Sequence, residues 1–108
     1  MCNQETILVL TNVPNEDCAN EIADALIKLH LAACVNILSP CQSVYRWKGN
    51  IERTTEIPMM IKTHRLAYAE VEKIILTMHP YELPEIISLN VDGGLPAYLQ
   101  WVSAQLLH

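Results

Sequence analysis

The sequence has no phenylalanine, only three glycines, and only seven lysines and arginines among 108 residues. The basic residues are spread singly, so they form no stripe that would neutralise a phosphate backbone or an anionic membrane surface. Twelve acidic residues bring the formal net charge to -5, which also disfavours nucleic acid as a partner. We therefore expect neither nucleic-acid nor membrane binding.

Most motifs with a known catalytic logic are missing too. There is no P-loop, no glycine-rich dinucleotide turn, no HExxH and no GxSxG pattern. The four cysteines form no CxxC pair, and reduced thiols are expected. We expect a protein that is not an enzyme and that uses no organic cofactor.

Apolar residues are plentiful: hydrophobic residues make up 51% of the chain and charged residues 18%. The length fits one domain over residues 1–108, and this composition is rich for a monomer of that size, so we expect part of the apolar surface to meet another subunit. The first residues carry no basic region and no long apolar run, which predicts a cytoplasmic protein without a signal peptide.

Hydrophobic periodicity predicts the first half of the fold. The unbroken apolar run at Thr6 to Leu10 is typical of a buried strand. Apolar residues at helical spacing then predict a helix to about His30, with Asn15 as its N-cap. A second strand is expected over Ala33 to Leu38, and the proline that follows it indicates an edge strand or a bulge.

The second half continues with a long hairpin. Ser43 to Trp47 alternates apolar with polar residues, a turn follows, and Ile51 to Thr63 is the return strand. A helix over Tyr68 to Met78, a strand over Ile86 to Val91 and a closing helix over Pro96 to Leu107 complete the chain. The order βαββαβ plus a helix predicts an α+β, ferredoxin-like fold with an antiparallel sheet and both main helices on one face.

Other proteins of this fold fit the residues poorly. The segment TNVPNED at 11–17 has neither the arginine nor the glycine of an acylphosphatase loop. An RNA-recognition domain needs exposed aromatics in basic surroundings, and a copper chaperone needs its CxxC pair. The fold alone therefore indicates no function.

The segment HPYELPE, residues 79–85, is the first candidate site. Its two prolines stiffen the loop after the second helix, and a stiff loop positions side chains. His79 can act as an imidazole ligand for a metal, with Glu82 and Glu85 as oxygen donors beside it. A structural alternative is that His79 caps the C-terminus of the helix.

Other candidates have a structural alternative as well. Tyr81 and Trp47 are candidates for lining a pocket, although buried aromatic side chains more often only pack. Cys34 is a possible thiolate ligand or simply a small buried hydrophobe. Lys62 and Glu56 lie on the hairpin, where charges commonly solvate an edge strand or bridge subunits.

Five segments together resemble one family. They are AACVNI at 32–37, SVYRWKGNIE at 43–52, MMIKT at 59–63, HPYELPEII at 79–87 and YLQW at 98–101. In this order they resemble the bacterial CutA proteins of divalent-cation tolerance, in register from about Ile7 to the C-terminus.

The resemblance implies a ferredoxin-like protomer in a tight homotrimer, similar in architecture to PII-type signalling proteins, with the hairpin arm pairing across subunits. It implies a role in divalent-cation homeostasis through binding of copper or another divalent cation, with Cu²⁺ suited to mixed donors from Cys34, His79, Glu82 and Glu85. An alternative function is a PII-like signalling or interaction module that holds a small anionic ligand or a partner protein in inter-subunit clefts. The residues expected to line those clefts are Trp47, Lys62, Tyr81 and Glu85.

Overall fold

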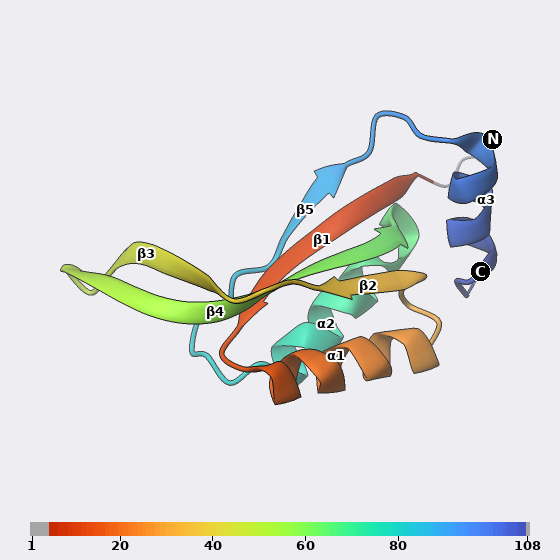
Figure 1. Ribbon diagram of the computed structural model, residues 1–108. Helices are drawn as coiled ribbons and strands as arrows, with labels where there is room; N and C mark the ends of the chain where they lie inside the picture. Colours follow the sequence, from red (N-terminus) through yellow and green to blue (C-terminus); the bar gives the residue numbers. More distant parts are fainter. Residues whose placement is uncertain (1–4, 108) are drawn as a thin grey trace.

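A computed structural model describes residues 5–107 and has an antiparallel sheet at its centre (Figure 1). The strands lie in the order β2 (Cys34–Ile37), β4 (Asn50–His64), β1 (Thr6–Val13), β5 (Ile87–Asn90). Every pair in this order is antiparallel. The predicted α+β fold with an antiparallel sheet is confirmed.

Two helices, α1 (Glu16–Lys28) and α2 (Tyr68–Met78), lie on one face of the sheet (Figure 1). The N-cap of α1 is Asn15 as predicted, since its side chain accepts a hydrogen bond from the Cys18 amide at 2.8 Å. The third helix, α3 (Pro96–Ala104), packs at one end of the sheet, against β1 and β4.

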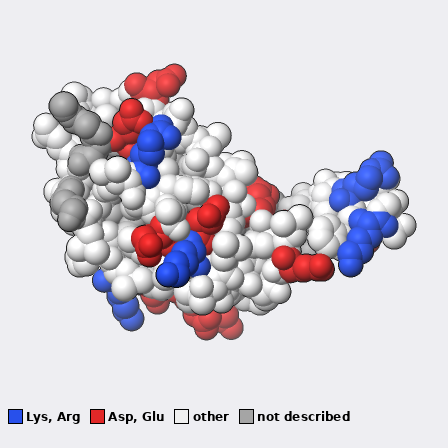
Figure 2. All heavy atoms as spheres, turned by 180° about the vertical axis from the view of Figure 1, so that it is seen from behind, with Lys and Arg blue, Asp and Glu red and all other residues white. Residues whose placement is uncertain are grey.

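The long hairpin forms an arm that projects from this body. Strand β3 (Cys41–Trp47) pairs only with the first half of β4, and the molecule measures 47 × 26 × 23 Å. Lys48 and Gly49 make the turn, both with positive φ, of 51° and 84°, as a two-residue hairpin turn requires. Figure 2 shows basic side chains gathered at the far end of this arm.

A bulge joins the arm to the body. Residues 38–40 stand opposite residues 57–58 of β4, so the outer strand has one extra residue between β2 and β3. Pro40 lies in this bulge, where it removes no hydrogen bond from a regular ladder. The predicted interruption by Pro40 is confirmed, and the bulge lets β2 and β3 follow the same partner strand in turn.

The two faces of the sheet differ in what covers them. Alternate residues of β1 and β4 are buried against the helices and form the core together with the apolar faces of α1 and α2. In the part of the chain that the structure describes, no helix covers the opposite face, although this face also carries apolar side chains. They are Leu8, Leu10, Met60, Ile87 and Leu89, which the register places on one face and which are all at least partly exposed.

Several element ends differ from those predicted. Strand β1 continues to Val13, because Asn12 and Val13 still pair with β4 although the apolar run ends earlier. Helix α3 stops at Ala104, and the short 3-10 helix η1 (Arg65–Ala67) was not anticipated. Within residues 5–107, no helix is long and apolar enough to cross a membrane.

Candidate functional site

His79 is held on both sides of its ring. Its Nε2 lies 2.7 Å from the carbonyl oxygen of Asn12 at the end of β1, and its Nδ1 accepts a hydrogen bond from the Tyr81 amide at 3.2 Å. The Nε2–H tautomer satisfies both contacts, and only 7% of the residue is exposed. The imidazole therefore ties the loop after α2 to the end of β1. His79 is also the C-cap residue of α2, as the capping alternative expected, but it caps through its backbone N–H, which donates to the Ile75 carbonyl at 2.8 Å, and not through its imidazole.

The rest of the loop is ordered around this histidine. The Tyr81 ring lies against the His79 ring, with centroids 4.7 Å apart. Pro80 and Pro84 limit the backbone conformations on either side. The loop thereby presents a fixed set of side chains toward the arm.

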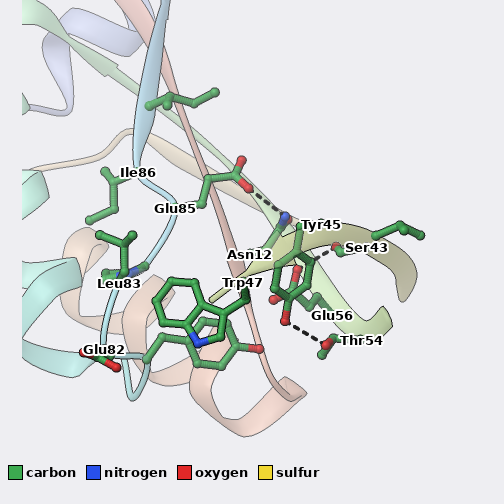
Figure 3. A pocket seen from close by; sticks show the side chains of 14 residues that line it. Asn12, Ser43, Tyr45, Trp47, Thr54, Glu56, Glu82, Leu83, Glu85 and Ile86 are labelled. Carbon is green, nitrogen blue, oxygen red and sulfur yellow. Dashed lines mark hydrogen bonds between the residues drawn. The ribbon is translucent and has the colours of Figure 1, made fainter. Parts of the chain in front are cut away.

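A groove with a volume of about 1000 Å³ lies between this loop and the base of the arm (Figure 3). Its walls combine apolar and aromatic side chains with hydroxyls and carboxylates, the usual make-up of a small-molecule site. The arm and β1 contribute Asn12, Ser43, Val44, Tyr45, Trp47, Thr54 and Glu56, and the loop contributes Tyr81 to Ile87.

The floor of the groove contains a buried carboxylate. Glu56 is 6% exposed and accepts a 2.6 Å hydrogen bond from the Ser43 hydroxyl. Burial, together with the hydrogen bond to Glu56 and the nearby negative charge of that carboxylate, raises the pKa of Tyr81 to about 12. The phenol of Tyr81 therefore stays protonated at neutral pH, beside the Glu56 carboxylate. The Ser43–Glu56 bond lies within the arm, and the burial of Glu56 excludes a solvated edge charge, whereas bridging between subunits stays a prediction.

Two further carboxylates line the groove nearer solvent. Glu85 accepts a hydrogen bond from the Asn12 amide at 3.1 Å. Glu82 lies 3.9 Å from the ammonium of Lys48, which itself stands 5.6 Å from the centre of the Trp47 ring. No lysine or arginine is among the residues that line the groove, so its lining charge is entirely negative.

The structure brings together four of the seven predicted site residues. Trp47, Tyr81, Glu82 and Glu85 all line the groove, and His79 supports it from beneath. Cys34 and Lys62 are cross-strand neighbours on β2 and β4 and do not line it.

The predicted metal ligands are therefore spread over two places in the chain. Across residues 5–107, no three His, Cys, Asp or Glu side chains converge on a point that could hold a metal ion.

Burial and the charge of Glu21 raise the pKa of the Cys18 thiol, which keeps this cysteine protonated.

Sequence reasoning missed Ser43, Tyr45 and Thr54 as groove residues. The signal in the sequence was the alternation of side chains between the two faces of the hairpin. Cross-strand pairing brings Ser43 opposite Thr54, and Tyr45 lies on the same face as Ser43. The groove itself depends on where the loop at 81–87 lies, and no local pattern indicates that.

The comparisons with known proteins agree with this fold. A family model described as "CutA1 divalent ion tolerance protein" matches residues 7–105. The Thermus thermophilus "Divalent-cation tolerance protein CutA" is 39% identical over 88% of this chain and 92% of its own length. The mouse "Protein CutA" is 46% identical over 82% of this chain but only 50% of its own length, so the chain spans about half of that relative. A solved structure of CutA1 from Shewanella sp. SIB1 has a TM-score of 0.92 and 41% identity, and the match covers 97% of this chain and 98% of that chain.

Proposed function

The chain belongs to the CutA1 divalent ion tolerance protein family, and on that premise we propose that it supports divalent-cation tolerance by binding Cu²⁺ or another divalent cation. We propose further that it does so as a cytoplasmic homotrimer without enzymatic activity. The observation that supports cation binding is the charge of the groove, where three carboxylates and no basic residue line the walls.

Glu82 and Glu85 are the donors this proposal relies on. Both are exposed, and a carboxylate oxygen is a ligand for hard and borderline divalent ions. His79 is occupied by two backbone groups, so its role in the proposal is to position the loop. Cys34 lies apart from the groove and is a second, independent candidate donor.

Calorimetric titration of Cu²⁺ and Mn²⁺ tests the cation proposal. We expect wild type to bind, and Glu82→Gln combined with Glu85→Gln to bind at least about tenfold more weakly, since two charged donors are lost. A matched control, Glu21→Gln with Asp24→Asn, removes the same charge from the exposed face of α1 and should leave the affinity unchanged. Equal affinities in wild type and the groove variant would exclude the groove, and a loss in Cys34→Ser alone would move the site to Cys34.

The trimer proposal is supported by the helix-free face of the sheet. Leu8, Leu10 and Met60 lie there beside Ile87 and Leu89, which are 48% and 47% exposed. A contiguous exposed apolar face of this kind usually marks a subunit interface. Light scattering at micromolar concentration should report three chains, and Leu89→Glu should shift the mass toward one. A monomer mass for wild type would contradict the proposal.

A second candidate function is a ligand-binding or signalling module. The size of the groove and its lining by Trp47, Tyr81 and Glu85 favour it. An anionic ligand in one chain's groove is disfavoured, because Lys62 lies elsewhere and the lining charges are negative. Thermal-shift screening of metabolites separates the two functions: stabilisation by metals alone removes this candidate.

A further inference from the structure

We propose that the groove at the base of the arm binds a linear aliphatic di- or polyamine. The inference rests on the second candidate function above, that the groove is a ligand site, and it specifies the chemical class of the ligand. Three independent features of the groove support it: an uncompensated carboxylate, aromatic walls, and an ammonium group that already lies at its mouth.

The first feature is the charge of Glu56. A buried carboxylate is normally paired with a cation or bound to a metal, because removing it from water is costly. Glu56 is 6% exposed, accepts a hydrogen bond from the Ser43 hydroxyl and lies near the protonated Tyr81 phenol, and both of these groups are neutral. Within residues 5–107 the ion pairs are Lys48 with Glu82 and Arg65 with Glu5, and neither involves Glu56. Its negative charge is therefore left for a cation that enters the groove.

The second feature is the type of wall. The rings of Tyr45 and Trp47 line the groove with Leu83 and Ile86 (Figure 3). Tyr81 lines it as well. Aromatic faces attract organic ammonium groups, and aliphatic side chains pack against methylenes. A bare metal ion would gain nothing from either kind of wall.

The third feature is an ammonium already in position. The Lys48 Nζ lies 5.6 Å from the Trp47 ring centre and 3.9 Å from the Glu82 carboxylate. One end of the groove thus already binds the chemical group that the ligand would supply. Because Lys48 sits on the turn of the arm and its side chain is 69% exposed, a free amine can displace it.

The spread of the carboxylates points to a linear ligand with more than one amine. Glu56, Glu82 and Glu85 lie at separate places around the groove in Figure 3, with apolar side chains between them. Ammonium groups joined by short methylene chains match that alternation of charged and apolar surface. A compact cation with a single charge satisfies one carboxylate only.

Fluorescence of Trp47 provides the readout. The chain has two tryptophans, so Trp101→Phe leaves Trp47 as the only indole. We expect spermidine, titrated at constant ionic strength, to cause a saturable change, and n-butylamine to bind at least about tenfold more weakly because it pairs with one carboxylate. Magnesium chloride at matched ionic strength should cause no saturable change.

Two substitutions move the affinity in opposite directions. Glu82→Gln with Glu85→Gln should weaken spermidine binding about tenfold, and Lys48→Met should tighten it about threefold by removing the internal competitor. Lys73→Met on α2, which removes the same charge away from the groove, should leave the affinity unchanged. A weaker affinity in Lys48→Met would indicate an anionic ligand and overturn the inference, as would an unchanged affinity in the double variant.

Cu²⁺ titrations of the same proteins keep the two proposals apart. If the wild type binds Cu²⁺ but does not bind spermidine, the amine inference is overturned and the metal proposal stays in place. The reverse result sinks only the metal proposal. A spermidine response that disappears as protein concentration rises would show that a second copy of the chain fills the groove, and it would overturn the inference.

Discussion

The body and the arm of this molecule are built from the same sheet but are stabilised differently. In the body, strand β4 is covered by α1 and α2, and residues such as Ile61 are fully buried. In the arm, the same strand pairs only with β3, and Ile51 is 67% exposed. Burial thus stabilises the body, whereas the arm depends on its turn, its ladder and the polar contacts at its base.

The arm also carries a different charge. Three of the seven basic residues, Arg46, Lys48 and Arg53, lie in it, and the acidic residues lie mostly in the body (Figure 2). An exposed segment whose charge is opposite to that of the rest of the molecule is suited to contact a ligand or another chain. The comparison explains why we place the proposed ligand site at the base of the arm and not in the body.

The largest effect should come from truncating the core. Ile61→Ala removes a fully buried side chain from the helix-covered face, and we expect a loss of about 2–5 kcal/mol in the free energy of unfolding. Ile51→Ala in the arm should cost less than about 0.5 kcal/mol. Urea denaturation at one protein concentration measures both. Similar losses would show that the arm is as buried as the body, through contact with another chain.

The junction between the two regions should respond next. Tyr81→Phe removes the phenol hydroxyl whose interaction with the buried Glu56 helps to raise the pKa of Tyr81, and we expect the change to cost about 1–2 kcal/mol. Tyr45→Phe is the matched control, because its hydroxyl bonds Thr54 in an exposed pair and should matter little.

Alkaline pH sharpens the same test. Folding raises the pKa of Tyr81 from its usual 10.0 to about 12, so its protonated phenol contributes stability that is fully present below pH 10. That contribution is lost as pH rises through 12, because the unfolded chain releases the proton first. Wild type should lose more stability than Tyr81→Phe between these pH values, and parallel curves would refute the assignment.

The turn of the arm should show a smaller and local effect. Gly49 has a φ of 84°, which an alanine adopts only with strain, so Gly49→Ala should weaken the hairpin by about 1 kcal/mol. Hydrogen exchange should speed up for amides of β3 while protection in β1 stays the same. Faster exchange throughout the sheet would mean that arm and body unfold together.

The smallest effect should be a gain. Thr11 is 1% exposed, and within residues 5–107 its buried hydroxyl has no hydrogen-bond partner. Thr11→Val replaces this hydroxyl with a methyl group of similar size. We therefore expect the free energy of unfolding, measured by thermal denaturation, to rise by about 0.5–1 kcal/mol. A loss of stability would reveal a partner for the hydroxyl.

Local patterns predicted the elements that depend on local physics. The N-cap at Asn15, the helix over Tyr68 to Met78 and the interruption at Pro40 were all predictable, because each is determined by neighbouring residues. The extension of β1 to Val13 was not, because pairing with β4 rather than apolar character keeps Asn12 and Val13 extended.

The candidate site divides in the same way. Trp47, Tyr81, Glu82 and Glu85 could be selected from the sequence because aromatic and acidic residues stand out beside prolines and turns. Glu56 could not be recognised as buried, since its burial comes from Ser43 and from Tyr81, which is distant in sequence. Lys62 does not line the groove of one chain, and its predicted place in a cleft between subunits stays a prediction.

By itself, the sequence determined the family, the order of the elements and the rigid loop at 79–85, since these follow from residue types and their spacing. Only the tertiary structure decided what that loop does. In the folded chain the His79 imidazole is hydrogen-bonded to the Asn12 carbonyl, although the sequence had indicated this imidazole as a metal ligand. Folding also leaves a groove of negative charge between the loop and the arm, because contacts between residues far apart in sequence decide which polar groups are satisfied and which remain for a ligand.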